Sequence, residues 1–221
     1  MTDHSGNKFG YISTFNFTWI TAVVYAVGAA GHLIGQVYPM MILITPWFLA
    51  LSALSVLYPW LRAADNKVII WAAALFIFTF LAEAAGTATG KIFGSYIYGE
   101  TLGLKILAVP PVIAVNWVIV TAGIIFWAEK ITSRIYFTVL ITAAGAVLFD
   151  FIMEPSAIYN NYWTWKDGII PVQNYLAWAI IAGAAAFFRK LLKTENRAEY
   201  PGILVIVQFC FFLVLRISYL F

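Results

Sequence analysis

The chain carries little charge and has no polar stretch long enough to form a soluble domain. Of its 221 residues, 10% are charged and 63% are hydrophobic, and the mean hydropathy is +0.88. A typical soluble domain is about 25% charged. The formal net charge of +3 is small and spread along the chain, which argues against a nucleic-acid partner. The composition therefore indicates a protein embedded in membrane lipids.

Residues that anchor common cofactors are scarce as well. The single cysteine, Cys210, can form no intramolecular disulfide. The two histidines, His4 and His32, leave no convincing metal set with carboxylates, and there is neither a glycine-rich phosphate loop nor a nucleophile elbow. The last apolar run, 202–220, lacks the lysine that a retinal Schiff base needs. We therefore expect no metal and no cofactor.

Long apolar runs predict an all-α polytopic membrane protein with about seven transmembrane helices. A span needs about 20 mostly apolar residues. The runs lie at about 15–33, 40–61, 68–88, 106–128, 131–151, 172–192 and 201–220, within a single transmembrane domain, 1–221. Nine of the 13 basic residues fall on the side of the N-terminus, which predicts a cytoplasmic N-terminus in a multi-pass protein of the cell membrane.

Two carboxylates, Glu83 and Asp150, lie inside these apolar runs. An ionisable group at the centre of a span costs about 2.5–3.5 kcal/mol on insertion scales and usually marks a functional site. Glu154 follows Asp150 by four residues, so both share a face if the helix continues, although Pro155 favours a helix end near that point. Alternatively, the carboxylates only join helices by hydrogen bonds or bind a divalent ion through oxygen.

Other unusual polar residues are expected at the same depth as these carboxylates. Helix direction and rise place them in the outer half of the bundle, whereas the inner half is almost entirely aliphatic or Phe. Two long outer loops add aromatic rings, which also suit a membrane interface. The candidate substrate- or water-binding residues are Thr87, Asn116, Tyr96, Tyr98, Tyr162, Trp163, Trp165, Asn174, His32 and Arg216. Packing by a hydrogen-bonded His32 and extension of Arg216 toward the surface are the plainer alternatives.

An acid in an apolar pocket, a nearby base and aromatic walls suit proton-driven chemistry on an alkene. A buried carboxyl group tends to keep its proton and can act as an acid, and a carboxylate in a wetter place can act as a base. Aromatic faces stabilise a cation. This combination favours protonation of a double bond, a tertiary carbocation and capture by water, with no cofactor. A proton-coupled membrane carrier of a small solute is the alternative, although the inner half offers almost no polar path for it.

Two segments carry a further pattern. They are Glu83-Ala-Ala-Gly86-Thr87-Ala-Thr89-Gly90 and Asp150-Phe-Ile-Met-Glu154-Pro155, the second followed by Tyr162-Trp163-Thr-Trp165. Together, over about 80–178, they resemble the carotenoid-biosynthesis membrane proteins of the CruF type. The resemblance implies a carotenoid hydratase, a hydro-lyase that adds water to the terminal 1,2 double bond of an acyclic carotenoid ψ-end and forms a tertiary alcohol. It places Glu83, Asp150 and Glu154 on the family's acidic positions, with Glu-Pro where the family often has Asp-Pro.

These observations predict a role for each acid. Asp150 lies between two phenylalanines and has the more apolar surroundings, so we expect it to donate the proton. Glu83 has small neighbours and Thr87 one turn away, which leaves room for a water that it orients. Glu154 would orient Asp150 through their i+4 spacing.

The predicted site also has a predicted shape. The three acids, with Asn116 and Asn174, are expected to line one cavity that opens in the outer half of the bundle. A carotenoid is longer than the ~30 Å hydrocarbon core. We therefore expect it to enter sideways from the lipid, with one end in the cavity.

Overall fold

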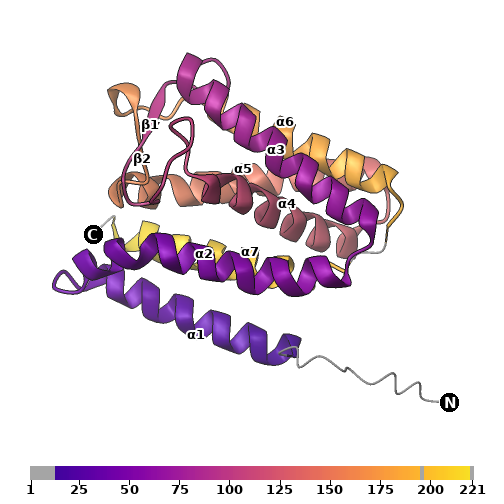
Figure 1. The fold of residues 1–221 in the computed structure, drawn as a ribbon, viewed down its shortest axis with the longest axis horizontal. Helices are drawn as coiled ribbons and strands as arrows, with labels where there is room; N and C mark the ends of the chain where they lie inside the picture. Colours follow the sequence, from indigo (N-terminus) through magenta and orange to yellow (C-terminus); the bar gives the residue numbers. More distant parts are fainter. Residues whose placement is uncertain (1–12, 195–196, 220–221) are drawn as a thin grey trace.

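The computed structural model describes residues 13–194 and 197–219, which form mainly α-helices. The helices are α1 (Thr14–Leu33), α2 (Tyr38–Ala63), α3 (Asn66–Thr89), α4 (Pro111–Ile131), α5 (Ile135–Tyr159), α6 (Val172–Leu191) and α7 (Glu199–Ser218) (Figure 1). Five of these seven, namely α2 to α5 and α7, are long and apolar enough to cross a membrane. The prediction of an all-α protein with several membrane-length helices is thus confirmed, while α1 and α6 are not among the five.

The start of the fourth helix differs from the sequence prediction. The fourth helix begins at Pro111 instead of near residue 106, because Ile106 and Val109 pair across a turn. Leu107 and Ala108 adopt positive φ angles of 51° and 64° in that turn. A proline at the first helical position then starts α4, since its fixed φ suits the helix and its missing N–H needs no partner there.

The predicted helix end at Pro155 is wrong, because α5 continues through this proline to Tyr159. A proline has no N–H, so it leaves the carbonyl four residues earlier, that of Phe151, without its helical partner. The guanidinium of Arg216 on α7 donates to that carbonyl and lies over the Phe151 ring. This external donor compensates for the missing bond and lets Asp150 and Glu154 stand on one continuous helix.

The helices lie side by side in layers (Figure 1). The closest neighbours include α5 with α6, α4 with α7, and α1 with α7. The second helix packs against α1, α4 and α7, whereas the third packs against α4 and α6. The packing between α2 and α3 is therefore weaker than the packing in any of these pairs.

Two short strands, which the sequence prediction missed, join the two long loops at one end of the bundle. Strand β1 (Tyr96–Tyr98) pairs antiparallel with β2 (Trp163–Trp165), with Tyr96 opposite Trp165 and Tyr98 opposite Trp163. The four outer positions of this pairing are buried and the two central ones are exposed, as expected for alternating strand faces. Directly after β1 the chain passes close to the backbone of Asn161. This position requires Gly99, since a Cβ there would lie 2.0 Å from the Asn161 carbonyl oxygen. We call this end of the bundle the sheet end.

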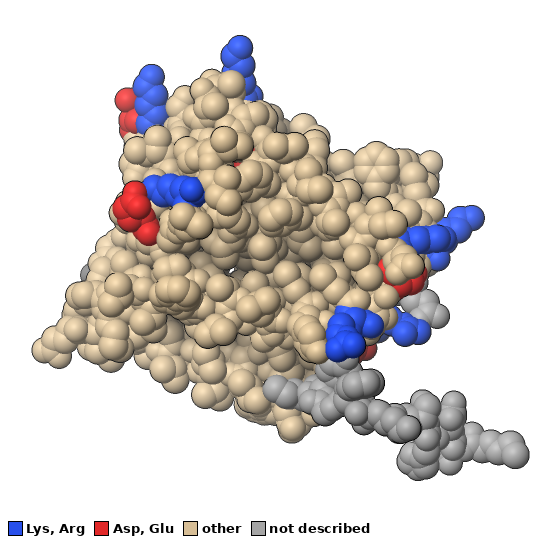
Figure 2. All heavy atoms as spheres, in the orientation of Figure 1, with Lys and Arg blue, Asp and Glu red and all other residues tan. Residues whose placement is uncertain are grey.

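Charged side chains on the face seen in Figure 2 gather toward the two ends of the helices. A broad band between them carries almost none. Many large apolar side chains are exposed, among them Trp47, Leu43 and Ile70 at 75%, 74% and 67%. Exposed apolar side chains on this scale are expected where lipid, not water, covers the helices.

Candidate active site

A cavity of about 80 Å³ of water-accessible volume lies among the helices near the sheet end. Every helix except α1 contributes to its lining, as do both strands. The volume exceeds the 10–15 Å³ or so that one water needs, so several waters or one end of an isoprenoid chain fit. The five residues predicted to share a cavity, Glu83, Asn116, Asp150, Glu154 and Asn174, all line it.

Glu83 on α3 is buried and accepts hydrogen bonds from neutral donors only. Trp117 Nε1 donates to Glu83 Oε1 at 2.9 Å, and the hydroxyls of Tyr96 and Tyr98 donate to Oε2, that of Tyr98 at 2.8 Å. The strand β1 thus places both tyrosines on this carboxyl group from one face. Gly90, with a φ of 68°, ends α3 and turns the chain toward β1.

The two tyrosines stay protonated in the fold. Burial is the main cause that raises the pKa of Tyr96 and of Tyr98, and the nearby carboxyl group of Glu83 raises it further. Both hydroxyls are therefore hydrogen-bond donors across the physiological pH range. They can hold a carboxylate or pass a proton without becoming charged themselves.

Glu154 on α5 is held in a similar way by β2. The indole N–H groups of Trp163 and Trp165 both donate to Glu154 Oε2, each at 3.0 Å. An indole N–H can only donate, so Oε2 is the acceptor in both bonds. The other oxygen, Oε1, faces the amide of Asn174 at 3.4 Å.

Asp150 accepts fewer hydrogen bonds than the other two acids. Asn174 Nδ2 donates to Asp150 Oδ2 at 2.6 Å, while Oδ1 is buried without a hydrogen-bond partner. The shared amide of Asn174 shows that Asp150 and Glu154 lie close together on one face of α5. Asp150 therefore has one carboxyl oxygen free to face a ligand in the cavity.

No cation balances these acids within the part of the chain that the structure describes. The ion pairs found there join Lys105 to Glu100 and Lys190 to Glu129, both outside the cavity. Neither the described histidine nor the cysteine joins the acids in a cluster that could hold a metal ion. Adjacent buried carboxyl groups without a cation are expected to share protons, because like charges in an apolar site repel strongly.

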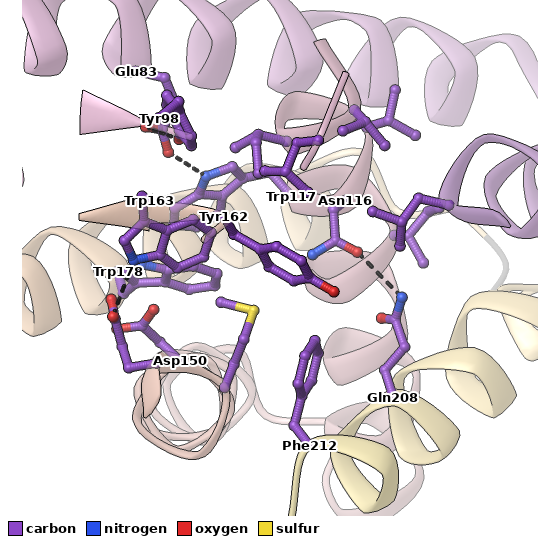
Figure 3. A pocket seen from close by; sticks show the side chains of 18 of the residues that line it. Glu83, Tyr98, Asn116, Trp117, Asp150, Tyr162, Trp163, Trp178, Gln208 and Phe212 are labelled. Carbon is purple, nitrogen blue, oxygen red and sulfur yellow. Dashed lines mark hydrogen bonds between the residues drawn. The ribbon is translucent and has the colours of Figure 1, made fainter. Parts of the chain in front are cut away.

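Aromatic rings form most of the remaining wall. Trp117 stacks on Trp178 with ring centroids 3.9 Å apart, and Tyr96 packs on Trp165 at 4.9 Å. Tyr162 projects into the cavity between the acids and α7 (Figure 3). The faces of such closely packed aromatic rings stabilise a positive charge that forms between them.

Sequence similarity to known proteins identifies the family of this chain. A family described as carotenoid biosynthesis proteins matches residues 38–221. The chain belongs to this family. Bisanhydrobacterioruberin hydratase from Haloarcula japonica is 24% identical over 160 residues, which cover 67% of this chain and 52% of that protein. The chain thus spans about half the length of this curated relative. No solved structure matches the chain.

The cavity also contains a polar side chain that the sequence analysis missed. Gln208 on α7 is buried, and its Nε2 donates to Asn116 Oδ1 at 3.3 Å and to the Tyr25 hydroxyl at 3.4 Å. Asn116 and Gln208 meet across the cavity from Asp150 (Figure 3). A polar residue within the apolar run of α7 is the sequence signal that could have indicated Gln208, and the sequence analysis did not use it.

Three of the candidate residues do not line the cavity. The hydroxyl of Thr87 donates to carbonyls of its own helix, and His32 bonds the carbonyl of Gly28 on α1 at 2.7 Å. The guanidinium of Arg216 donates to the carbonyl of Phe151 on α5. The other candidates, Tyr96, Tyr98, Asn116, Tyr162, Trp163, Trp165 and Asn174, surround the cavity with the three acids.

Proposed function

We propose that this protein adds water to the terminal 1,2 double bond of an acyclic carotenoid ψ-end, by acid and base catalysis within the membrane and without a cofactor. The observation that carries the proposal is the set of Glu83, Asp150 and Glu154 around one aromatic cavity, with no cation beside them among the described residues. Membership of the carotenoid biosynthesis family and the relative named as a hydratase support the substrate class and the reaction.

Asp150 is the proposed proton donor. Both oxygens of Glu83, and Oε2 of Glu154, already accept hydrogen bonds from fixed neutral donors, whereas Asp150 Oδ1 has no partner. Transfer of the Asp150 proton to C2 of the ψ-end consumes the π electrons and leaves a tertiary carbocation at C1. The faces of the surrounding rings stabilise that cation.

Water then completes the reaction. Its oxygen attacks C1, and the proton it loses goes to Glu83, directly or through a tyrosine hydroxyl on that carboxyl group. Return of this proton through cavity water to Asp150 restores the starting state, so the net change is addition of one water. Glu154, fixed by two indoles and linked to Asp150 through Asn174, is proposed to orient the acid.

The proposed topology follows from the layers of the fold. Helices α1 and α6, each 20 residues long, lie alongside the others, and about 30 Å of helix is enough to cross the hydrocarbon core. We propose seven spans, a cytoplasmic N-terminus and an outward-facing sheet end, since most basic residues lie toward the opposite end. The wall between α2 and α3 is the proposed entrance from the lipid, because these helices pack on other partners.

Expression in bacteria that accumulate lycopene tests the function directly. Pigments would be separated by chromatography and their masses measured. We expect a new pigment heavier by one water, formed with wild-type protein and absent with Asp150→Asn. Expression of folded wild-type protein with no hydrated pigment, from lycopene or from other acyclic carotenoids, would contradict the proposal and favour a proton-coupled carrier.

A further inference from the structure

The amide of Gln208 has an unmet hydrogen-bonding need inside the cavity. Gln208 is 5% exposed, and its Oε1 is buried with no partner among the residues that the structure describes. Its Nε2 makes only the two long bonds to Asn116 and Tyr25. A buried amide oxygen without a partner is costly, and more so in a helix within lipid, where no bulk water can replace the partner.

The surroundings of this amide are polar where the rest of α7 is not. The Tyr25 hydroxyl on α1 accepts from Gln208 and lies near the side chain of Ser52 on α2, so three helices bring polar groups to the same place. Asn116 brings a fourth helix, α4. Asn116, Ser52 and Gln208 all line the cavity, which is therefore polar on two sides, with Tyr162 and Phe212 between them (Figure 3).

We infer that Asn116 and Gln208 form a second binding subsite, which takes an O–H group across the cavity from the carboxylates. An O–H group would donate to Gln208 Oε1 and would accept from the Asn116 amide. Because it both donates and accepts, it would satisfy the amide of Gln208 in either of its two orientations.

Two sources can supply this O–H group: a water molecule held for the reaction, or a hydroxyl that the carotenoid already carries near its reacting end. A water here would stand on the side of the substrate opposite to Asp150. A substrate hydroxyl here would make the subsite a determinant of which carotenoid is accepted. The inference rests on the proposed function for its kinetic part only, because binding can be measured without turnover.

The test uses the full-length protein in lipid nanodiscs and two acyclic carotenoids that differ by one hydroxyl near the end group. Binding is followed by quenching of tryptophan fluorescence, since Trp117, Trp163, Trp165 and Trp178 line the cavity. Turnover is followed by chromatography. The variant is Gln208→Met, which keeps an unbranched side chain of similar length without polar atoms. The control is Leu213→Met, a volume-conserving change on α7 away from the cavity lining.

If the substrate supplies the O–H group, wild type binds the hydroxylated carotenoid about tenfold tighter, and Gln208→Met removes this preference. If water supplies it, wild type binds both equally, and Gln208→Met lowers the turnover of both by about tenfold with binding unchanged. A folded Gln208→Met that binds and converts both carotenoids as Leu213→Met does would overturn the inference. Should Gln208→Met not fold, Asn116→Leu replaces it with the same expected outcomes.

The hydration proposal can fail separately. If folded wild type converts neither carotenoid, hydration is refuted and the subsite is judged on binding alone. A preference for the hydroxylated carotenoid that Gln208→Met removes would then still support the subsite. Equal binding of both carotenoids by wild type and variant would overturn it.

Discussion

Replacing Asp150 by Asn should abolish hydration while leaving the fold intact. The substitution keeps the shape of the side chain and keeps an oxygen that accepts from Asn174, at the position where the carboxylate now accepts at 2.6 Å. The new NH₂ group would take the place of Oδ1, which has no partner to lose. It could also donate to the adjacent Glu154. We therefore expect the free energy of unfolding to change by less than about 1 kcal/mol.

The catalytic loss should be far larger than the change in stability. A positioned general acid contributes about 10²–10⁴-fold to the rate. At 1.36 kcal/mol per tenfold, this is about 2.7–5.4 kcal/mol of transition-state stabilisation. Because the amide cannot supply the proton, the loss should fall on kcat, and binding of the carotenoid should stay within about threefold of wild type.

The assay compares purified wild type, Asp150→Asn and Glu100→Gln in nanodiscs with the same carotenoid. Glu100 is the matched control, since its side chain is 89% exposed in an ion pair with Lys105 outside the cavity. Product is quantified by chromatography, binding by tryptophan quenching and folding by thermal unfolding. A folded Asp150→Asn that converts substrate within threefold of Glu100→Gln would show that Asp150 is not the acid.

Three further changes have separate expected outcomes. Trp163→Phe removes one of the two indole N–H donors to Glu154 and should cost about 1 kcal/mol of stability and lower kcat. Burial raises the pKa of Tyr96 and Tyr98 above the ordinary value near 10, so their stabilising effect is complete below about pH 10 and is lost as the pH rises further. Replacing both by Phe should therefore flatten the decline of Tm above about pH 10. Arg216→Met removes the donor to a free carbonyl of α5 and should lower stability by about 1 kcal/mol without changing KM.

Each of these outcomes has a control within the chain. Trp127→Phe removes an indole N–H that donates to the carbonyl of Gly202, away from the cavity, and should leave kcat unchanged. A Trp163→Phe protein with the kcat of Trp127→Phe would separate Glu154 from catalysis. An identical alkaline decline of Tm in wild type and in the double Phe variant would refute the assignment to the tyrosines. A large rise in KM for Arg216→Met would place Arg216 at the substrate.

Sequence patterns located the helices and the acids because both signals are local. A run of apolar residues defines a membrane-length helix by itself, and a charge inside such a run stands out, as Glu83 and Asp150 did. The pairing of Tyr96 with Trp165 could not be predicted in this way. Strands of three residues carry almost no periodic pattern, and their partners come from loops that are distant in the sequence.

Depth along the helices also proved easier to predict than direction around them. Helix rise placed His32 and Thr87 at the level of the acids, but rise alone does not determine which way a side chain faces. His32 stands on the one helix that does not line the cavity, and Thr87 bonds its own helix. Gln208 was missed for the complementary reason, since only the packing of α7 against α4 brings it to Asn116.

The kind of donor that holds the acids bears on the chemistry. A lysine or arginine beside Glu83 or Glu154 would stabilise an ionised carboxylate more strongly than the indoles and phenols do, but it would also place a positive charge next to the proposed carbocation. Neutral N–H and O–H donors fix the carboxyl groups without that repulsion. They also leave the acids able to exchange protons, which a permanent ion pair would oppose. Burying several acids among Trp and Tyr therefore suits the proposed formation of a cation from a neutral hydrocarbon.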